Sequence, residues 1–231
     1  MSKILIAIPC MDQTPTPFAM SVADLRTPQG DATAKGWQMG SLIYTSRNNL
    51  AIKAMKIGED EDGDEAIVDV DFDYVLWLDS DMVFSSDLLI RMKSVLNDNG
   101  LDFLTGLYFR RVPPFSPVLF DQLDIDNEGN CKWTDFQEVP KEGLFKVGGC
   151  GFGAVLLKTD VLFDVQAKFG NMFAPIGNMG EDLSFCWRAR QCGYDIWCDP
   201  SIEVGHVGYT IINRNFYESY SSVHKGGKEN A

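Results

Sequence analysis

The sharpest chemical feature of the sequence is a pair of carboxylates, Asp79 and Asp81, which flank Ser80 and directly follow an apolar run at 74–78. Two carboxylates at this spacing can converge on one divalent cation, and Mg²⁺ and Mn²⁺ prefer oxygen ligands that they readily share with phosphates. A diphosphate leaving group needs such a cation, because negative charge builds on it as its bond breaks. Taken alone, the pattern is equally that of an ordinary Asp-rich turn.

A second acidic pair, Glu181 and Asp182, follows Gly180 and opens a predicted helix over 181–192. The helix dipole favours acidic residues in a first turn, which explains the pair without any function. A carboxylate that faces a cleft instead could act as a general base toward a hydroxyl group. His206, one of only two histidines, could complete a carboxylate-bound metal site or serve as a structural hydrogen-bonding residue.

These side chains need elements that bring them together, and the sequence predicts alternating strands and helices. The continuous apolar run at 74–78 is typical of a parallel strand buried on both faces. Such alternation indicates a mainly parallel sheet, in which ligands bind beyond the carboxyl ends of the strands, where Asp79 stands. Further strands are expected at 3–9, 102–109, 118–123, 131–136 and 194–198, with helices from 16, over 41–57, over 87–99, from 159 and over 181–192.

Three segments have a distinctive composition. Four glycines within 145–158 precede a strand, which is the wrong order for a dinucleotide-binding motif, so a tight bend or close approach of the backbone to a substrate explains them better. The stretch at 59–73 holds nine acidic residues and is expected to be a solvated loop. The segment from about 213 is expected to be a polar, loosely held tail.

Size and charge limit the function. The 231 residues suit a single domain over 1–231. No apolar stretch is long enough to span a membrane, the N-terminus lacks a signal peptide and the six cysteines form no CxxC pair, so a cytoplasmic protein with reduced thiols is expected. The net charge of −13 disfavours broad nucleic-acid binding, although a local basic groove around Arg110 and Arg111 is compatible with it.

Together, these segments resemble the GT-A fold glycosyltransferases, and family 2 most of all, in a soluble, single-domain form of the kind found in phage and bacteria. The resemblance runs in order through ILIAIP, SRNNLAIKAM, YVLWLDSDMVFSSDLL, VGGCGFGAVLLKTDVL and GEDLSFCWRARQCGYDIWCDPSIEVGHVG. It implies an α/β fold of the GT-A type, a Rossmann-like three-layer sandwich with a mostly parallel central sheet. It also implies transfer of a sugar from a UDP- or GDP-sugar to an unidentified acceptor, with Mn²⁺ or Mg²⁺.

The resemblance further implies roles for individual residues. Asp81 would be the main metal ligand with His206, while Asp79 would contact the metal, the ribose or the sugar. Asp182 would be the catalytic base of an inverting reaction, with Glu181 beside it. The nucleotide-sugar would contact Pro9, Met11, Arg47, Asn48, Asp79 and Ser80, and the acceptor side would include Gly149, Cys150, Gly151 and Trp187.

Two other functions fit parts of the sequence. A sugar nucleotidyltransferase could use a similar sheet, but such enzymes carry a glycine- and arginine-rich loop and a lysine after the first strand, and residues 10–18 contain neither. A catalytically decayed sugar- or nucleotide-binding module is the non-enzymatic alternative. The complete set of Asp79, Asp81, Asp182 and His206 argues against decay.

Overall fold

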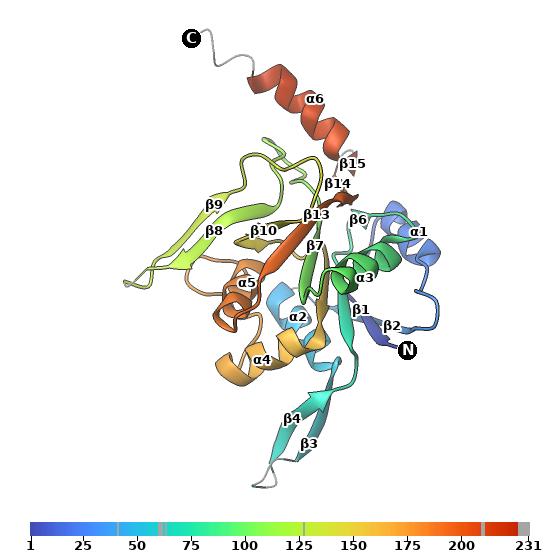
Figure 1. Cartoon of the computed structure of the whole chain (residues 1–231), viewed down its shortest axis with the longest axis vertical. Helices are drawn as coiled ribbons and strands as arrows, with labels where there is room; N and C mark the ends of the chain where they lie inside the picture. The colour runs from blue at the N-terminus through green and yellow to red at the C-terminus, as the bar shows by residue number, and fades with distance from the viewer. Residues whose placement is uncertain (41, 60–61, 63, 127, 209–210, 226–231) are drawn as a thin grey trace.

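A computed structural model describes residues 1–40, 42–59, 62, 64–126, 128–208 and 211–225. Its centre is a seven-stranded sheet in the order β10-β13-β7-β12-β5-β1-β2 (Figure 1). Only β10 and β12 run against the other five strands, so the expectation of a mostly parallel α/β sheet is confirmed. The strands are β1 (Lys3–Cys10), β2 (Ala32–Met39), β5 (Tyr74–Leu78), β7 (Phe103–Leu107), β10 (Phe145–Val147), β12 (Ala154–Lys158) and β13 (Ile196–Glu203).

Helices cover both faces of this sheet, which makes three layers. Buried residues of α2 (Ile43–Ile52), α4 (Thr159–Phe169) and α5 (Glu181–Gln191) share one core cluster with the strands. Residues of α1 (Thr16–Asp24) and α3 (Leu88–Asp98) share the other. The strand β5 supplies both clusters, with Val75 and Trp77 on one face and Leu76 and Leu78 on the other, as a strand between two helical layers must.

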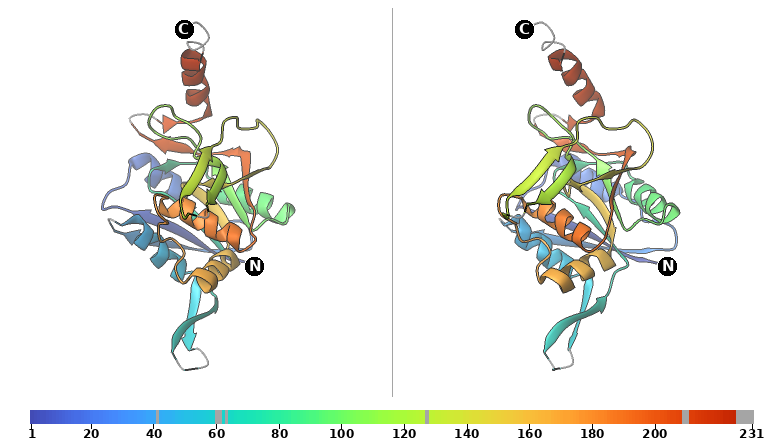
Figure 2. Two further views of the ribbon diagram at one scale, coloured as in Figure 1. Left: turned by 90° about the vertical axis from the view of Figure 1, so that its left-hand side faces the viewer. Right: turned by 60° about the vertical axis from the view of Figure 1, so that its left-hand side comes forward.

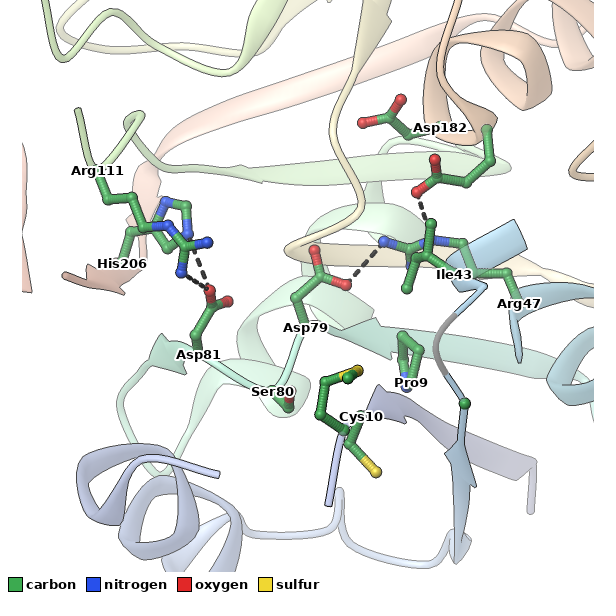
Figure 3. Close-up of a pocket in the computed structure, with 13 residues that line it drawn as sticks. Pro9, Cys10, Ile43, Arg47, Asp79, Ser80, Asp81, Arg111, Asp182 and His206 are labelled. Atoms are coloured by element: carbon green, nitrogen blue, oxygen red, sulfur yellow. Dashed lines mark hydrogen bonds and ion pairs between the residues drawn. The ribbon is translucent and has the colours of Figure 1, made fainter. Parts of the chain in front are cut away.

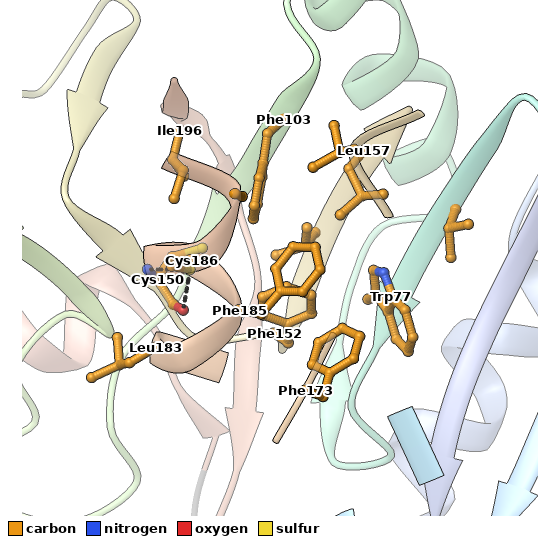
Figure 4. Packing of buried hydrophobic residues seen from close by; sticks show 14 of the residues in the cluster. Trp77, Phe103, Cys150, Phe152, Leu157, Phe173, Leu183, Phe185, Cys186 and Ile196 are labelled. Carbon is orange, nitrogen blue, oxygen red and sulfur yellow. Dashed lines mark hydrogen bonds between the residues drawn. The ribbon is translucent and has the colours of Figure 1, made fainter. Parts of the chain in front are cut away.

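The larger core is aromatic and lies directly beneath the α5 helix (Figure 4). Phe173 and Phe185 stack with ring centroids 4.6 Å apart, and Phe152 and Trp77 meet Phe173 edge-on at 5.3 and 5.2 Å. Such pairs add to the free energy of simple area burial. They fix α5, and therefore its acidic first turn, against the end of β5.

Smaller sheets surround the central one. One contains β8 (Leu119–Ile125), β9 (Cys131–Asp135) and β11 (Gly149–Cys150), and another contains β6 (Met82–Val83), β14 (Gly205–Val207) and β15 (Ile211–Ile212). Within the described residues, none of the helices combines the length and apolar composition needed to cross a membrane.

Two expectations for the N-terminal half are wrong. The helix expected over 41–57 ends at Ile52, and the acidic stretch expected to be a loop forms a hairpin of β3 (Met55–Glu59) and β4 (Glu65–Val70). Lys56 pairs with Asp69 at 2.6 Å across the hairpin, and Ile67 packs on the core, so the hairpin has contacts both between its strands and with the core. Figure 1 shows the hairpin projecting from the sheet; positions 60, 61 and 63 lie outside the described residues.

The C-terminal segment also differs from the expected loosely held tail. Helix α6 (Arg214–Lys225) projects from the opposite end to the hairpin in all three views (Figures 1 and 2). Its aromatic side chains at i, i+1 and i+4 form one stripe: Tyr217 stacks on Phe109 at 4.7 Å, and Phe216 and Tyr220 meet Phe115 edge-on. This stripe holds the helix onto the loop that follows β7, whereas 226–231 lie outside the described residues.

Candidate active site

A cavity of about 330 Å³ opens where β1 and β5 end at the carboxyl edge of the sheet (Figure 3). It brings together most of the residues singled out in the sequence, from five separate segments of the chain. They are Pro9, Met11, Arg47, Asp79, Ser80, Asp81, Glu181, Asp182 and His206, joined by Cys10, Gly40, Ile43 and Arg111.

His206 reaches Asp81 because β14 pairs with β6, the short strand directly after the Asp79-Ser80-Asp81 segment, with His206 opposite Met82. Its Nε2 lies 3.3 Å from Oδ2 of Asp81, and its Nδ1 lies 2.9 Å from the carbonyl oxygen of Phe109. Burial of the imidazole disfavours its charged form, but the Asp81 carboxylate outweighs burial, so the pKa of His206 is raised. The Phe109 carbonyl orients the ring with Nε2 facing the carboxylate.

Asp79 faces a different partner. The Arg47 guanidinium, only 3% exposed, donates to Oδ1 of Asp79 at 2.7 Å and to Oε1 of Glu181 at 3.3 Å. It also lies over the Phe152 ring at 5.2 Å. Burial raises the pKa of Asp79 despite this cation. Arg47 therefore joins the end of β5 to the start of α5 in the cavity wall, and its expected contact with the base or diphosphate stays a prediction.

Asp182 also faces the cavity, from the first turn of α5 (Figure 3). Its Oδ1 accepts the backbone N–H of Leu183 at 2.7 Å. Burial, reinforced by the adjacent Glu181 carboxylate, raises the pKa of Asp182 to about 6. A carboxylate with this pKa is ionised at neutral pH and basic enough to accept a proton from a reacting hydroxyl.

The cavity offers two of the three protein ligands expected for a metal ion. Among the described residues, no three His, Cys, Asp or Glu side chains gather closely enough to hold one. Asp79, the third expected ligand, is paired with Arg47. Asp81 and His206 still fit Mn²⁺ or Mg²⁺: the carboxylate is a hard oxygen ligand, and the Phe109 carbonyl leaves the Nε2 lone pair of the neutral imidazole for a cation. Ions bound by one or two protein side chains complete their coordination with substrate phosphates and water.

Five residues expected at the site do not line this cavity. The Asn48 side chain contacts the segment at 171–173, donating to Oδ1 of Asn171 at 3.1 Å and accepting the Phe173 N–H at 3.1 Å. Trp187 packs on Phe169 of α4. Gly149, Cys150 and Gly151 are buried, with Gly149 and Cys150 paired to β8, and none of the three lines the cavity.

Two glycines of this loop, Gly151 and Gly153, make room for Tyr108. A Cβ at Gly151 would lie 2.0 Å from the Tyr108 hydroxyl, and one at Gly153 would lie 2.8 Å from its Cζ and 2.5 Å from Cε of Met82. The Gly153 N–H donates to the Tyr108 hydroxyl at 3.1 Å. Tyr108 in turn meets the His206 ring edge-on at 5.8 Å, so the glycines support the site from behind.

Arg111 is a cavity residue that the sequence indicated only as part of a basic groove. It follows β7, and its Nη1 donates to Oδ2 of Asp81 at 2.7 Å. Its position just beyond the carboxyl end of a central strand is the signal that could have assigned it to the site. Cys10 and Ile43, which carry no comparable signal, complete the wall toward β1 and α2.

The three-layer α/β fold, with its mostly parallel central sheet, is of the GT-A type, as its structural neighbours show. No family model and no curated protein matches the sequence. The structure resembles A197 from STIV, with a TM-score of 0.59 and 16% identity over 93% of this chain and 95% of that one. It also resembles GalNAc-T7, solved with UDP, GalNAc and Mn²⁺, with a TM-score of 0.57 and 11% identity over 90% of this chain.

GalNAc-T7 is a GT-A fold glycosyltransferase, and this chain spans 44% of its length. At these identities the likeness establishes the fold, so membership of family 2 stays a prediction.

Proposed function

We propose that the protein is a divalent-cation-dependent glycosyltransferase that uses a nucleotide diphosphate sugar. The observation that carries this proposal is the charge of the cavity: four carboxylates line it against the two guanidinium groups of Arg47 and Arg111. An excess of negative charge repels a diphosphate at close range. A cation bound to those carboxylates would allow the cavity to accept a diphosphate, and a neighbour of the same fold was solved with UDP and Mn²⁺.

Asp81 and His206 would hold the cation, Mn²⁺ or Mg²⁺, which supplies charge neutralisation to a departing diphosphate. Arg47 holds Asp79 and Glu181 in the cavity wall by pairing with both. Asp182 accepts the proton of the acceptor hydroxyl as the oxygen attacks the anomeric carbon and the bond to the diphosphate breaks. Direct displacement of this kind inverts the anomeric centre.

The nucleoside would occupy a neighbouring cavity of about 510 Å³ that shares Cys10 and Met11 with the first. It is bounded by Trp37 and Met39 at the end of β2 and by Asp12 in the loop after β1. The side chains of Met11 and Met39 and the ring of Trp37 provide apolar surface that suits the faces of a nucleobase. The acceptor is the part of the reaction for which no contact is assigned.

The test is release of UDP or GDP from a panel of UDP- and GDP-sugars in the presence of Mn²⁺, Mg²⁺ or a chelator. Wild-type protein should bind or hydrolyse at least one donor, and the chelator should abolish this. Asp81→Asn should lose the cation-dependent signal, whereas Asp121→Asn, which changes an exposed carboxylate of β8, should keep it. A wild-type protein that neither binds nor hydrolyses any donor contradicts the proposal.

A further inference from the structure

One carboxylate oxygen of the cavity has two side-chain partners, a guanidinium group and an imidazole. Oδ2 of Asp81 lies 2.7 Å from Nη1 of Arg111 and 3.3 Å from Nε2 of His206 (Figure 3). His206 is largely buried, with its side chain 14% exposed, whereas the Arg111 side chain is 54% exposed. The arginine is therefore the more solvent-accessible of the two partners.

The backbone beneath Arg111 is firmly held. Arg110 donates its N–H to Ser116 at 2.9 Å across the loop between β7 and β8, and Phe115 at the loop tip is buried against α6. Within the described residues, the one ion pair of Arg111 is with Asp81. A fixed backbone with a half-exposed side chain allows the guanidinium to change partner while the loop stays in place.

A cation on Asp81 and the guanidinium on the same oxygen exclude each other, because the two positive charges would lie within a few ångströms in a partly buried cavity. If a cation takes Asp81, Arg111 needs another anion. The diphosphate that arrives with that cation provides one, and the planar guanidinium suits two phosphate oxygens better than an ammonium group does.

We infer that Arg111 is an exchangeable counter-ion: it neutralises Asp81 while the cavity is empty and moves to the donor diphosphate when a cation occupies Asp81. Arg111 is thus a positioning residue that couples cation binding to donor binding. This inference depends on the proposed function. It predicts that Arg111 has opposite effects on the binding of the cation and on the binding of the nucleotide. Arg111 opposes the cation alone and favours the nucleotide once the cation is present.

Arg111→Gln tests this with two binding measurements. In the absence of nucleotide, Mn²⁺ affinity is read from the electron paramagnetic resonance signal of free Mn²⁺, and it should rise about fivefold, the upper contribution of a partly exposed ion pair. In saturating Mn²⁺, the affinity for UDP or GDP, whichever binds wild-type protein, is measured by calorimetry. It should fall about tenfold through loss of a charge-assisted hydrogen bond.

Arg110→Gln is the matched control. It removes the same charge from the neighbouring position, where Arg110 pairs with Asp135 at 3.1 Å and does not line the cavity, so both affinities should stay at wild-type values. An Arg111→Gln protein that weakens both ligands, or alters neither, overturns the inference while leaving the proposed function intact. A wild-type protein that binds neither nucleotide in Mn²⁺ overturns both. Thermal melting shows that each variant is folded.

Discussion

Replacing Asp182 with Asn should make the protein more stable and less active at neutral pH. Burial raises the pKa of Asp182 from 3.8 to about 6, with a further contribution from Glu181, so ionising this side chain in the folded protein costs free energy. A rise of that size corresponds to about 3 kcal/mol. Because the side chain retains some solvent access, the expected gain in the free energy of unfolding is about 1–2 kcal/mol. The amide oxygen can still accept the Leu183 N–H.

The stability difference between Asp182→Asn and wild type should depend on pH, and the raised pKa of Asp182 sets the direction of that dependence. A carboxyl group whose folded pKa lies above its unfolded value loses stability as the pH rises between the two values. The gap between Asp182→Asn and wild type should therefore open between pH 3.8 and about 6 and stay constant above that range. Urea unfolding followed by tryptophan fluorescence at pH values of about 4, 6 and 7.5 measures it.

Glu181→Gln is the control for this measurement, because it changes the adjacent carboxyl but removes an ion pair with Arg47 at 3.3 Å. It should destabilise the protein where Asp182→Asn stabilises it. An Asp182→Asn variant that is less stable than wild type at neutral pH, or whose advantage does not shrink toward pH 4, refutes the reasoning that burial strains this carboxylate.

The same substitution, Asp182→Asn, should also lower the enzymatic activity. Loss of a general base lowers the rate by about 10²–10⁴-fold, and Asp182→Asn should do so for donor hydrolysis while leaving nucleotide affinity near the wild-type value. Because the ionised form is the base, wild-type activity should fall about tenfold per pH unit below a pH of about 6. Full activity in Asp182→Asn contradicts the assigned role.

Two further predictions concern the support of the site. Arg47→Met leaves Asp79 and Glu181 partly buried without their shared cation, so the free energy of unfolding should fall by about 3–5 kcal/mol, and Arg47→Lys should recover part of it in the same urea titration. Gly153→Ala places a Cβ 2.5 Å from Cε of Met82 and 2.8 Å from Cζ of Tyr108. It should cost about 1–3 kcal/mol and weaken Mn²⁺ binding through the displaced Tyr108–His206 contact, and unchanged Mn²⁺ affinity argues against that support.

Local pattern was enough to place the carboxylates. A five-residue apolar run between polar segments dictates a doubly covered strand, and the position of Asp79 and Asp81 at its carboxyl end follows from the chain direction alone. The glycine that precedes Glu181 and the helical pattern after it likewise fixed the start of α5. The mostly parallel sheet follows from this alternation, and it is confirmed.

Contacts between distant segments could not be read in this way. The hydrogen bonds from Arg47 to Asp79 and Glu181 depend on how α2 is rotated toward the end of β5 and the start of α5. The sequence of residues 41–57 does not determine that rotation. Strand β2 alternates between partly exposed and exposed positions at the sheet edge, so it lacks the apolar run that identifies a central strand. The sequence left open whether the glycine loop makes a tight bend or approaches a substrate, because Tyr108, the neighbour of Gly151 and Gly153, comes from another part of the chain.

The central claim is that a cation bound by Asp81 and His206 holds a nucleotide diphosphate in the cavity at the end of β5. A crystal soaked with Mn²⁺ and UDP or GDP tests it by anomalous diffraction at the manganese edge. We predict one peak in direct contact with Oδ2 of Asp81, Nε2 of His206 and two phosphate oxygens, with Arg111 turned from Asp81 to the diphosphate. A nucleotide bound without metal, or manganese at a different place, would contradict it.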